Sequence, residues 1–336
     1  MTADAAGRGT PEPEPEPAPR SLRGTARQWL LGGLLLAALV AWVHHAVGWW
    51  SLLAPWRDLP PSHLLGLLAL AALSYVLRAV RAYDALRSLV RGRFLTMLRV
   101  TVLHTAANNL LPMRLGEAAF PILVRRHFGL RLTRGTLALA WIRLMDLHVL
   151  GLVAAIALVL STAGSLPASL ALAAWLLALP LGIRLLPVAA ERVAPAGLAG
   201  RLLRAVRETG PADVPELARL YLWTALSWAA KLAAFAAITA HFLDAPAGTI
   251  LAGIVGAELS SVLPFHGVAG AGSYEAAMVA ALYPFGVEPA AALGAAVNLH
   301  LFLLGVTLLS SLAALLIPAP RAGTPADPVA EEANRA

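Results

Sequence analysis

Uncharged apolar runs divide most of the chain into segments long enough to cross a membrane. A transmembrane helix needs about 20 apolar residues, and the runs without Asp, Glu, Lys or Arg cover residues 28–56, 59–77, 147–183 and 289–320. The third run is long enough for two helices joined by a turn. Single polar residues interrupt further apolar segments at 100–124, 135–146, 217–243 and 248–286. Such residues usually face a bundle interior or a water-filled cavity.

Arginine-rich segments flank these runs and indicate their orientation. Residues 78–99 and 125–134 are both rich in arginine, which is typical of cytoplasmic loops. A single crossing by the segment between them would put two basic loops on opposite sides. A re-entrant hairpin over 100–124 removes this conflict, and its tip is expected at Asn108, Asn109 and Pro112.

A second break is expected within residues 248–286, where Pro264, Gly267, Gly270 and Gly272 interrupt the apolar run. If this segment is a hairpin from the outside, the order helix, helix, hairpin, helix occurs twice, starting from opposite sides. That is the pattern of an inverted-topology repeat, with a site at the broken helices. The expected fold is an all-α polytopic membrane protein of about six full spans plus two re-entrant or broken hairpins. Eight plain transmembrane helices are the alternative.

Composition agrees with this class of protein. The chain is 59% hydrophobic and 13% charged, against roughly 45–50% and 25% in a soluble domain. Its net charge of +7 does not indicate nucleic-acid binding, because the basic residues lie between apolar stretches. There is no cysteine, and no metal constellation, nucleotide-binding loop or catalytic triad is recognisable. We therefore expect no cofactor, no metal and no enzymatic activity.

The chain is expected to have three regions. Residues 1–27 are predicted to be a disordered, Pro- and Glu-rich cytoplasmic tail, residues 28–318 a single transmembrane domain, and residues 319–336 a disordered C-terminal tail. The basic loops place both termini in the cytoplasm and the protein, as a multi-pass protein, in the cell membrane.

Three polar elements occur in order along the apolar segments. They are Asn108-Asn-Leu-Leu-Pro-Met-Arg-Leu-Gly-Glu117, Arg143-Leu-Met-Asp146, and a Gly-rich element from Pro264 to Glu275. Together they resemble the lysylphosphatidylglycerol synthase transmembrane (flippase-like) family over roughly residues 30–317. The chain departs from that family at Ile142, where many members have Glu, and in its less compact Gly-rich element.

The resemblance covers the membrane part of the family only. Because the chain ends at residue 336, we expect it to lack the soluble aminoacyl-transferase domain of the full-length synthases. Lipid aminoacylation is therefore not predicted.

The polar residues at membrane depth are the candidates for a substrate site. Arg114 and Glu117 share a helix face and can pair, and a planar guanidinium suits phosphate oxygens. They either hold a lipid or isoprenoid phosphate or form a structural ion pair. Glu275 is either a proton-coupling or counter-charge carboxylate or a helix cap. The candidate substrate-binding residues are Asn108, Asn109, Arg114, Glu117, Arg143, Asp146, His266 and Glu275.

Several of these polar residues have structural alternatives. Arg143 and Asp146 are three residues apart, so they can pair with each other as well as line a cavity. Lys231 and Glu258 lie on helices of the second half, and their pairing is a hypothesis that no residue spacing supports. His266 either titrates near neutrality or acts as a hydrogen-bonding residue in a loop. Asn298 and His300 are expected to form hydrogen bonds between helices.

These patterns predict a flippase-like protein that binds and translocates an anionic lipid or a lipid-linked precursor, so its expected partners are phosphate-bearing membrane lipids. The alternative is a non-transporting scaffold or regulator that docks a lipid- or glycan-modifying membrane enzyme. A transferase acting on a polyprenyl phosphate is a third class. It would need interfacial carboxylates, whereas the clustered acids Glu12, Glu14 and Glu16 lie in a repetitive tail.

Overall fold

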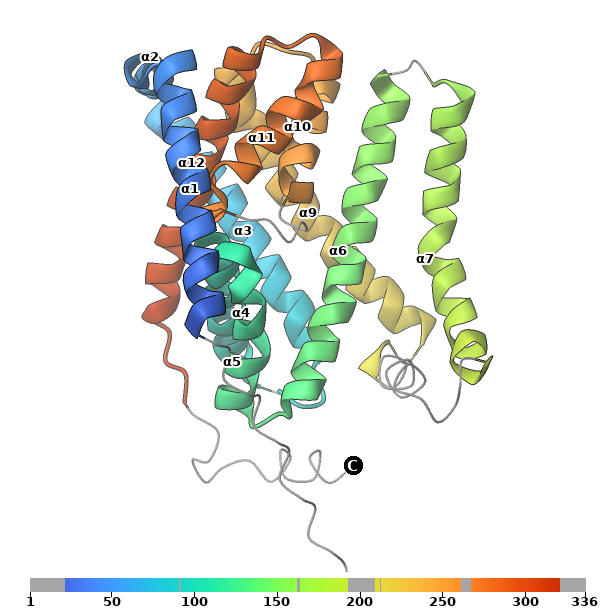
Figure 1. Ribbon diagram of the computed structural model, residues 1–336. Helices are drawn as coiled ribbons and strands as arrows, with labels where there is room; N and C mark the ends of the chain where they lie inside the picture. The colour runs from blue at the N-terminus through green and yellow to red at the C-terminus, as the bar shows by residue number, and fades with distance from the viewer. Residues whose placement is uncertain are drawn as a thin grey trace, which may run out of the picture.

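Figure 1 shows the computed structural model, which describes residues 22–90, 92–161, 164–192, 209–211, 213–260 and 267–320. Throughout these ranges the regular elements are helices, and no strand occurs. The long helices are α1 (Leu22–Ala46), α3 (Pro61–Ala85), α6 (Leu132–Ser161), α7 (Leu166–Arg192), α9 (Val214–Phe242) and α12 (Pro289–Leu315). The shorter elements join α1 to α3 and form two helical hairpins.

The helices have the length and composition of membrane spans. In the described part of the chain, α3, residues Leu132–Val159 of α6, α9 and α12 are each long and apolar enough to cross a membrane. Helix α1 continues into α2 (Trp49–Leu53) and the 3-10 helix η1 (Ala54–Asp58) through a 96° bend. The protein is therefore an all-α polytopic membrane protein, as the apolar runs predicted.

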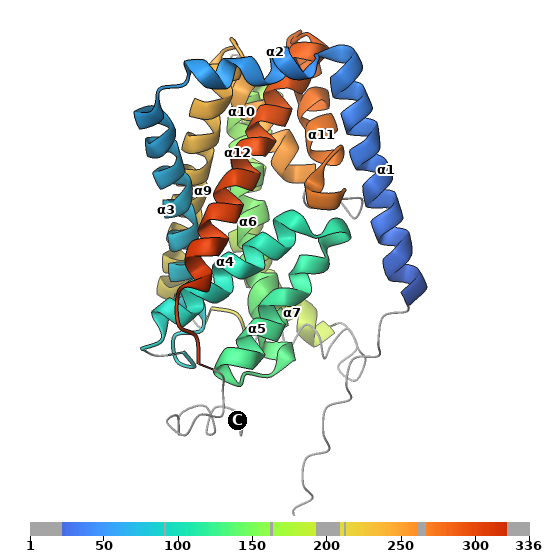
Figure 2. The ribbon, with the colours of Figure 1, turned by 90° about the vertical axis from the view of Figure 1, so that its left-hand side faces the viewer.

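Two hairpins of short helices enter the bundle from opposite ends, as Figure 2 shows. The first consists of α4 (Phe94–Leu110), η2 (Pro112–Ala118) and α5 (Ala119–Phe128). The second consists of α10 (Ala247–Ser260), η3 (Val268–Gly270) and α11 (Ser273–Leu282), followed by η4 (Tyr283–Phe285). Their tips η2 and η3 are in contact, and α1 packs against both. Helices α5 and α11 have ten residues each, too few to cross a membrane, which favours the hairpins over eight plain spans.

Proline and positive-φ residues produce the two breaks. Leu111 precedes Pro112 and is extended, at φ −86° and ψ 138°, because a following proline disfavours helical backbone. At the second tip, Ala269, Gly270 and Gly272 have φ of 52°, 81° and 86°. Only the alanine carries a side chain in this left-handed region, where it is strained. The break expected from the sequence is present at Leu111–Pro112, whereas Asn108 and Asn109, which were also expected in the tip, lie in the last turn of α4.

The segment 78–99 is not the single loop that the arginine pattern predicted. Helix α3 continues to Ala85 and α4 begins at Phe94, so Arg78 and Arg81 are helical. The prediction ended the span at the first charge, whereas both side chains line a cavity inside the bundle. Charged side chains that face a bundle interior do not end a membrane helix.

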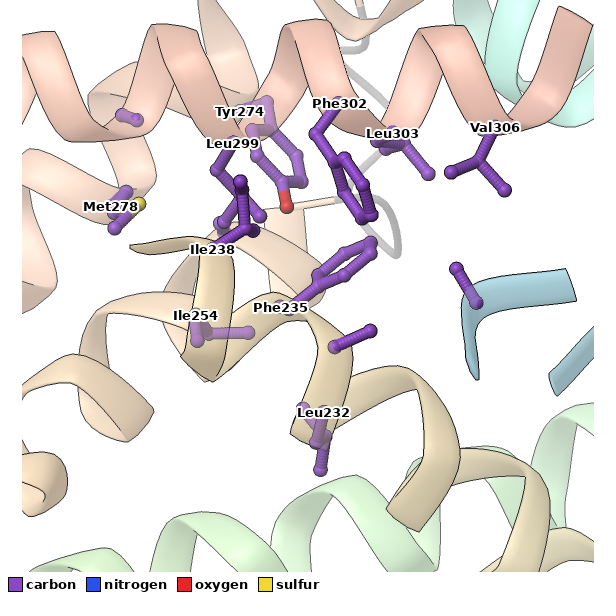
Figure 3. Packing of buried hydrophobic residues seen from close by; sticks show 14 of the residues in the cluster. Leu232, Phe235, Ile238, Ile254, Tyr274, Met278, Leu299, Phe302, Leu303 and Val306 are labelled. Atoms are coloured by element: carbon purple, nitrogen blue, oxygen red, sulfur yellow. The ribbon is translucent and has the colours of Figure 1, made fainter. Parts of the chain in front are cut away.

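The largest apolar core joins the second hairpin to α9 and α12, as Figure 3 shows. Phe235 of α9 and Phe302 of α12 meet edge to face, with ring centroids 6.2 Å apart. Ile254 of α10 and Met278 of α11 are fully buried beside them. This packing holds the second hairpin at a fixed depth, so the position of its tip is determined by the core.

Candidate functional site

A cavity of about 390 Å³ lies where the two hairpin tips meet. Its walls come from α3, α4, η2, α5, α6, α9, α10, η3, α11 and α12. Five of the residues predicted for the site line it: Asn108, Asn109, Glu117, Arg143 and Asp146. Asn108 and Asn109 lie on α4, Glu117 on η2, and Arg143 and Asp146 on α6. The packing of the first hairpin against α6 makes all five line one cavity.

Asp146 of α6 is the centre of the charge network. Its carboxylate oxygens lie 2.6 and 3.4 Å from the guanidinium of Arg81, and the indole N–H of Trp228 donates to Oδ1 at 2.9 Å. Arg143 Nη1 lies 3.4 Å from Oδ2. Asp146 and Arg81 are both buried. A carboxylate at this depth is stable only when such donors replace water.

A second pair connects this network to the first hairpin tip. Arg143 Nη2 lies 2.9 Å from Oε1 of Glu117, so the acid of the predicted signature pairs with the arginine of the following helix. Asn108 Nδ2 lies 3.2 Å from His104 Nε2 and 3.4 Å from Glu117 Oε1. The tip approaches α4 closely at Gly116, where a Cβ would lie 2.3 Å from the backbone of Ala107.

A third group lies on the opposite wall. Lys231 Nζ of α9 is 2.5 Å from Oε2 of Glu258 on α10, so the pairing expected for these residues is present. The hydroxyl of Tyr274 donates to the other oxygen of Glu258 at 3.4 Å. Lys231 also lies over the rings of Trp228 and Phe235, 5.2 and 4.9 Å from their centroids. This cation is therefore held by one acid and two aromatic faces.

Arg78 of α3 differs from the other cations of the cavity. Its Nε and Nη2 atoms are buried without a hydrogen-bond partner among the described residues, and its guanidinium lies 5.4 Å from the centroid of the Trp228 ring. The described lining carries Arg78, Arg81, Arg143 and Lys231 against Glu117, Asp146 and Glu258. The cavity therefore has one formal positive charge in excess. Arg78 supplies two unused guanidinium donors, and Nε of Arg81 is a third.

The remaining predicted residues have different positions. Glu275 begins α11 beside the cavity: its Oε2 accepts from Gly272 N–H at 2.8 Å, which is the expected helix cap. Its Oε1 lies 2.5 Å from Nδ1 of the cavity residue His300. Arg114 belongs to η2, but its side chain lies outside what the structure describes. His266 lies outside the described residues altogether.

Arg78 and Arg81 line the cavity but were not among the predicted site residues, because the sequence pattern assigned them to the basic loop 78–99. Their spacing was the available signal: residues three apart share one helix face, and an apolar helix precedes them. Trp228 and Tyr274 were missed because nothing in their local sequence separates them from other membrane aromatics. The described residues contain no group of three His, Asp or Glu that could hold a metal ion.

The fold and the cavity define a multi-pass membrane protein with a charged site at two broken helices. The sequence matches the family described as the lysylphosphatidylglycerol synthase TM region over residues 29–311. The chain belongs to this family, a group of membrane proteins tied to lipid handling. A comparison with curated proteins found no match.

Proposed function

We propose that the protein binds the headgroup of an anionic phospholipid or lipid-linked phosphate in this cavity and moves it between the leaflets of the cell membrane. The observation that carries the proposal is Arg78, a buried guanidinium with two unsatisfied donors. A buried unpaired cation is costly. A phosphate oxygen would satisfy these donors and neutralise the excess charge of the cavity.

The surroundings of Arg78 support a phosphate-bearing ligand. Asn108 and Asn109 line the same cavity. The amide of Asn109 donates one hydrogen to Thr307 Oγ1 at 2.8 Å, and its second hydrogen can be donated to a further oxygen. The Oδ1 atom of Asn108 is buried without a partner among the described residues, so it can accept from a hydroxyl of the same headgroup. A cavity of about 390 Å³ lies within the range of small-ligand sites, about 300–1,000 Å³.

One wall of the cavity favours a lipid over a water-soluble anion. Leu144 and Leu147 of α6 line the cavity and are also 44% and 39% exposed. In a membrane, exposed leucines of a spanning helix face acyl chains. An occupant can therefore keep its chains against α6 while its headgroup reaches Arg78.

The arrangement of the hairpins supports movement across the membrane. The tips meet in mid-bundle from opposite ends, which is the geometry of inverted-repeat transporters with a central site. Figure 2 places the α5–α6 turn at one end of the bundle, and the end of η1, the α9–α10 connection and the start of α12 at the other. In the sequence, Arg125, Arg126 and Arg131 adjoin the first of these, and Asp58, Asp244 and Glu288 adjoin the others. The basic end is proposed to be cytoplasmic. The N-terminal end of α1 and the C-terminal end of α12 lie at that end.

In this proposal the protein performs no bond chemistry, and its partners are the phosphate-bearing lipids themselves. Vesicles reconstituted with the purified protein and fluorescent phosphatidylglycerol test the proposal, with the fraction of probe protected from an impermeant quencher as the readout. We expect the wild-type protein to exchange the probe between leaflets and Arg78→Gln to slow the exchange about tenfold or more, as for a lost charge-assisted contact.

Arg57→Gln is the matched control. Arg57 also lies over a tryptophan, 4.5 Å from the ring centroid of Trp50, but it is exposed in η1, away from the cavity. We expect this variant to exchange lipid like the wild type. Equal exchange by Arg78→Gln and wild type would reject the proposal. A wild-type protein that moves no lipid but co-purifies with a membrane enzyme would favour the scaffold function instead.

A further inference from the structure

A buried Glu–His pair fastens the tip of the second hairpin to α12. Glu275 and His300 are 1% and 5% exposed, and Nδ1 of His300 lies 2.5 Å from Oε1 of Glu275. Nε2 of the same ring lies 2.8 Å from the carbonyl oxygen of Ala269. The imidazole therefore bridges the strained turn of the tip and the first turn of α11.

Counting donors and acceptors shows that the pair holds one exchangeable proton. The Ala269 carbonyl can only accept, so Nε2 of His300 carries a hydrogen. Oε2 of Glu275 already accepts from Gly272 N–H. The contact between Nδ1 and Oε1 then needs a second hydrogen, because two lone pairs at 2.5 Å repel each other. With that proton the pair is neutral overall, and without it the pair carries one negative charge.

Loss of this proton would weaken the attachment of the tip. The Nδ1 lone pair would then face a carboxylate oxygen in a buried site, which is unfavourable. The tip also stores strain, because Ala269 has φ 52° and persists only while its surroundings hold it. His300, Ala269 and Gly270 all line the cavity, so release of the tip would change the shape of the lipid site.

Other charged groups around the pair act on its proton through space. The ring of Tyr274 on α11 is tilted against that of His300, with centroids 4.7 Å apart. Its hydroxyl donates to Glu258 of α10, which pairs with Lys231 of α9. From α3 and α4, Arg78 and His104 line the same cavity. Residues 30–43 of α1, which packs against the tip, contain no titratable side chain. The pair is thus screened from water and shares a cavity with one excess positive charge.

We infer that Glu275 and His300 form a proton-binding site whose occupancy fastens the second hairpin tip and whose deprotonation releases it. The ligand of this site is a proton, and its exchange is coupled to headgroup movement through the shared cavity. The coupling rests on the proposed function, whereas the proton site itself does not.

Cysteine labelling tests the proton site without any lipid assay. The chain has no native cysteine, so Ala271→Cys, which lies buried in the tip, provides a single reporter. Its labelling rate is compared from mildly acidic to alkaline pH in the wild-type and Glu275→Gln backgrounds, and the ratio removes the intrinsic pH dependence of the thiol. The amide of Gln donates to Nδ1 and accepts from Gly272 N–H, so this variant mimics the protonated pair.

We expect the labelling rate in the wild-type background, divided by the rate in the Glu275→Gln background, to rise about tenfold or more towards alkaline pH. In a His300→Gln background, which cannot span both contacts, labelling should be fast at every pH apart from the thiol's own dependence. Glu288→Gln is the matched control, because Glu288 also caps a helix through a backbone N–H but is exposed. Its profile should follow the wild type. A ratio that stays constant with pH would overturn the proton site.

A second experiment, on lipid transport, distinguishes the proton site from the proposed function. In vesicles with a pH gradient, wild-type lipid exchange should change with the gradient, and exchange by Glu275→Gln should not. If the wild type moves no lipid while the labelling ratio responds to pH, the proposed function fails and the proton site stands. If lipid moves and the gradient has no effect on the wild type, the coupling is wrong.

Discussion

Arg81, Arg143 and Asp146 show how single residues determine whether the cavity is stable. The two arginines share one carboxylate at membrane depth, with Trp228 as a third donor. Each ion compensates the burial cost of its neighbours, so removal of one partner leaves the others uncompensated. The Nε and Nη2 atoms of Arg78 have no hydrogen-bond partner among the described residues, which distinguishes Arg78 from these paired residues.

Asp146→Asn should lower the free energy of unfolding by about 3–5 kcal/mol, because it leaves Arg81 buried without its counter-charge. Asp84→Asn is the matched control: Asp84 is 11% exposed, but its partner Arg219 is 38% exposed at the surface. Water can therefore solvate the arginine that remains, and the expected loss is about 1 kcal/mol, as for a surface pair. Thermal or denaturant unfolding in detergent measures both. Similar losses for the two variants would contradict the distinction between a buried network and a surface pair.

At the level of single residues, the sequence predicted part of the cavity lining. Asn108, Glu117, Arg143 and Asp146 were found because single polar residues in apolar runs are conspicuous. Arg78 was not, because a charge next to an arginine-rich segment looks like a loop residue until the length of α3 is known. The pairing of Lys231 with Glu258 needed no spacing rule, since each is a single charge in the apolar part of its helix.

The hairpins are the elements on which the account depends. Their breaks were predictable from Pro112 and from the glycines after Pro264, because these residues disfavour continuous helix. The depth at which each tip stops was not predictable, since it depends on contacts with elements far away in the sequence. One such contact is α1 against both tips, which brings Gly32 close to Val268.

Gly116→Ala should displace the first tip from α4. The added Cβ would lie 2.3 Å from backbone atoms of Ala107 and Asn108, which cannot move aside as a flexible side chain can. We expect a loss of about 1–3 kcal/mol or more in stability, with slower lipid exchange. Gly66→Ala on α3, where a Cβ meets nothing within 4 Å, should be neutral or stabilising by up to about 1 kcal/mol. Equal melting temperatures for the two variants would refute the close approach.

For the whole molecule, charge counting predicted the inverted order of elements, and the two hairpins do enter from opposite ends. This succeeded because a re-entrant segment, unlike a full crossing, leaves the next basic loop on the same side of the membrane. The full lining of the cavity could not be predicted from the sequence, because its residues lie on many helices, from Arg78 of α3 to Leu303 of α12.

Single cysteines at the bases of the two hairpins test the topology. Ser88 adjoins the start of the first hairpin and Asp244 that of the second, and both are exposed. In sealed vesicles of one orientation, an impermeant maleimide should label Ser88→Cys from one side only and Asp244→Cys from the other side only. Labelling of both from the same side would contradict opposite insertion.

The most direct test of the account combines lipid exchange and stability in Arg78→Gln. Because Arg78 is a buried cation with two donors unused by the described residues, its replacement removes a cost of folding. We predict that Arg78→Gln keeps or raises the melting temperature in detergent while exchange of phosphatidylglycerol falls about tenfold or more. Wild-type exchange by a well-folded Arg78→Gln protein would contradict the central claim.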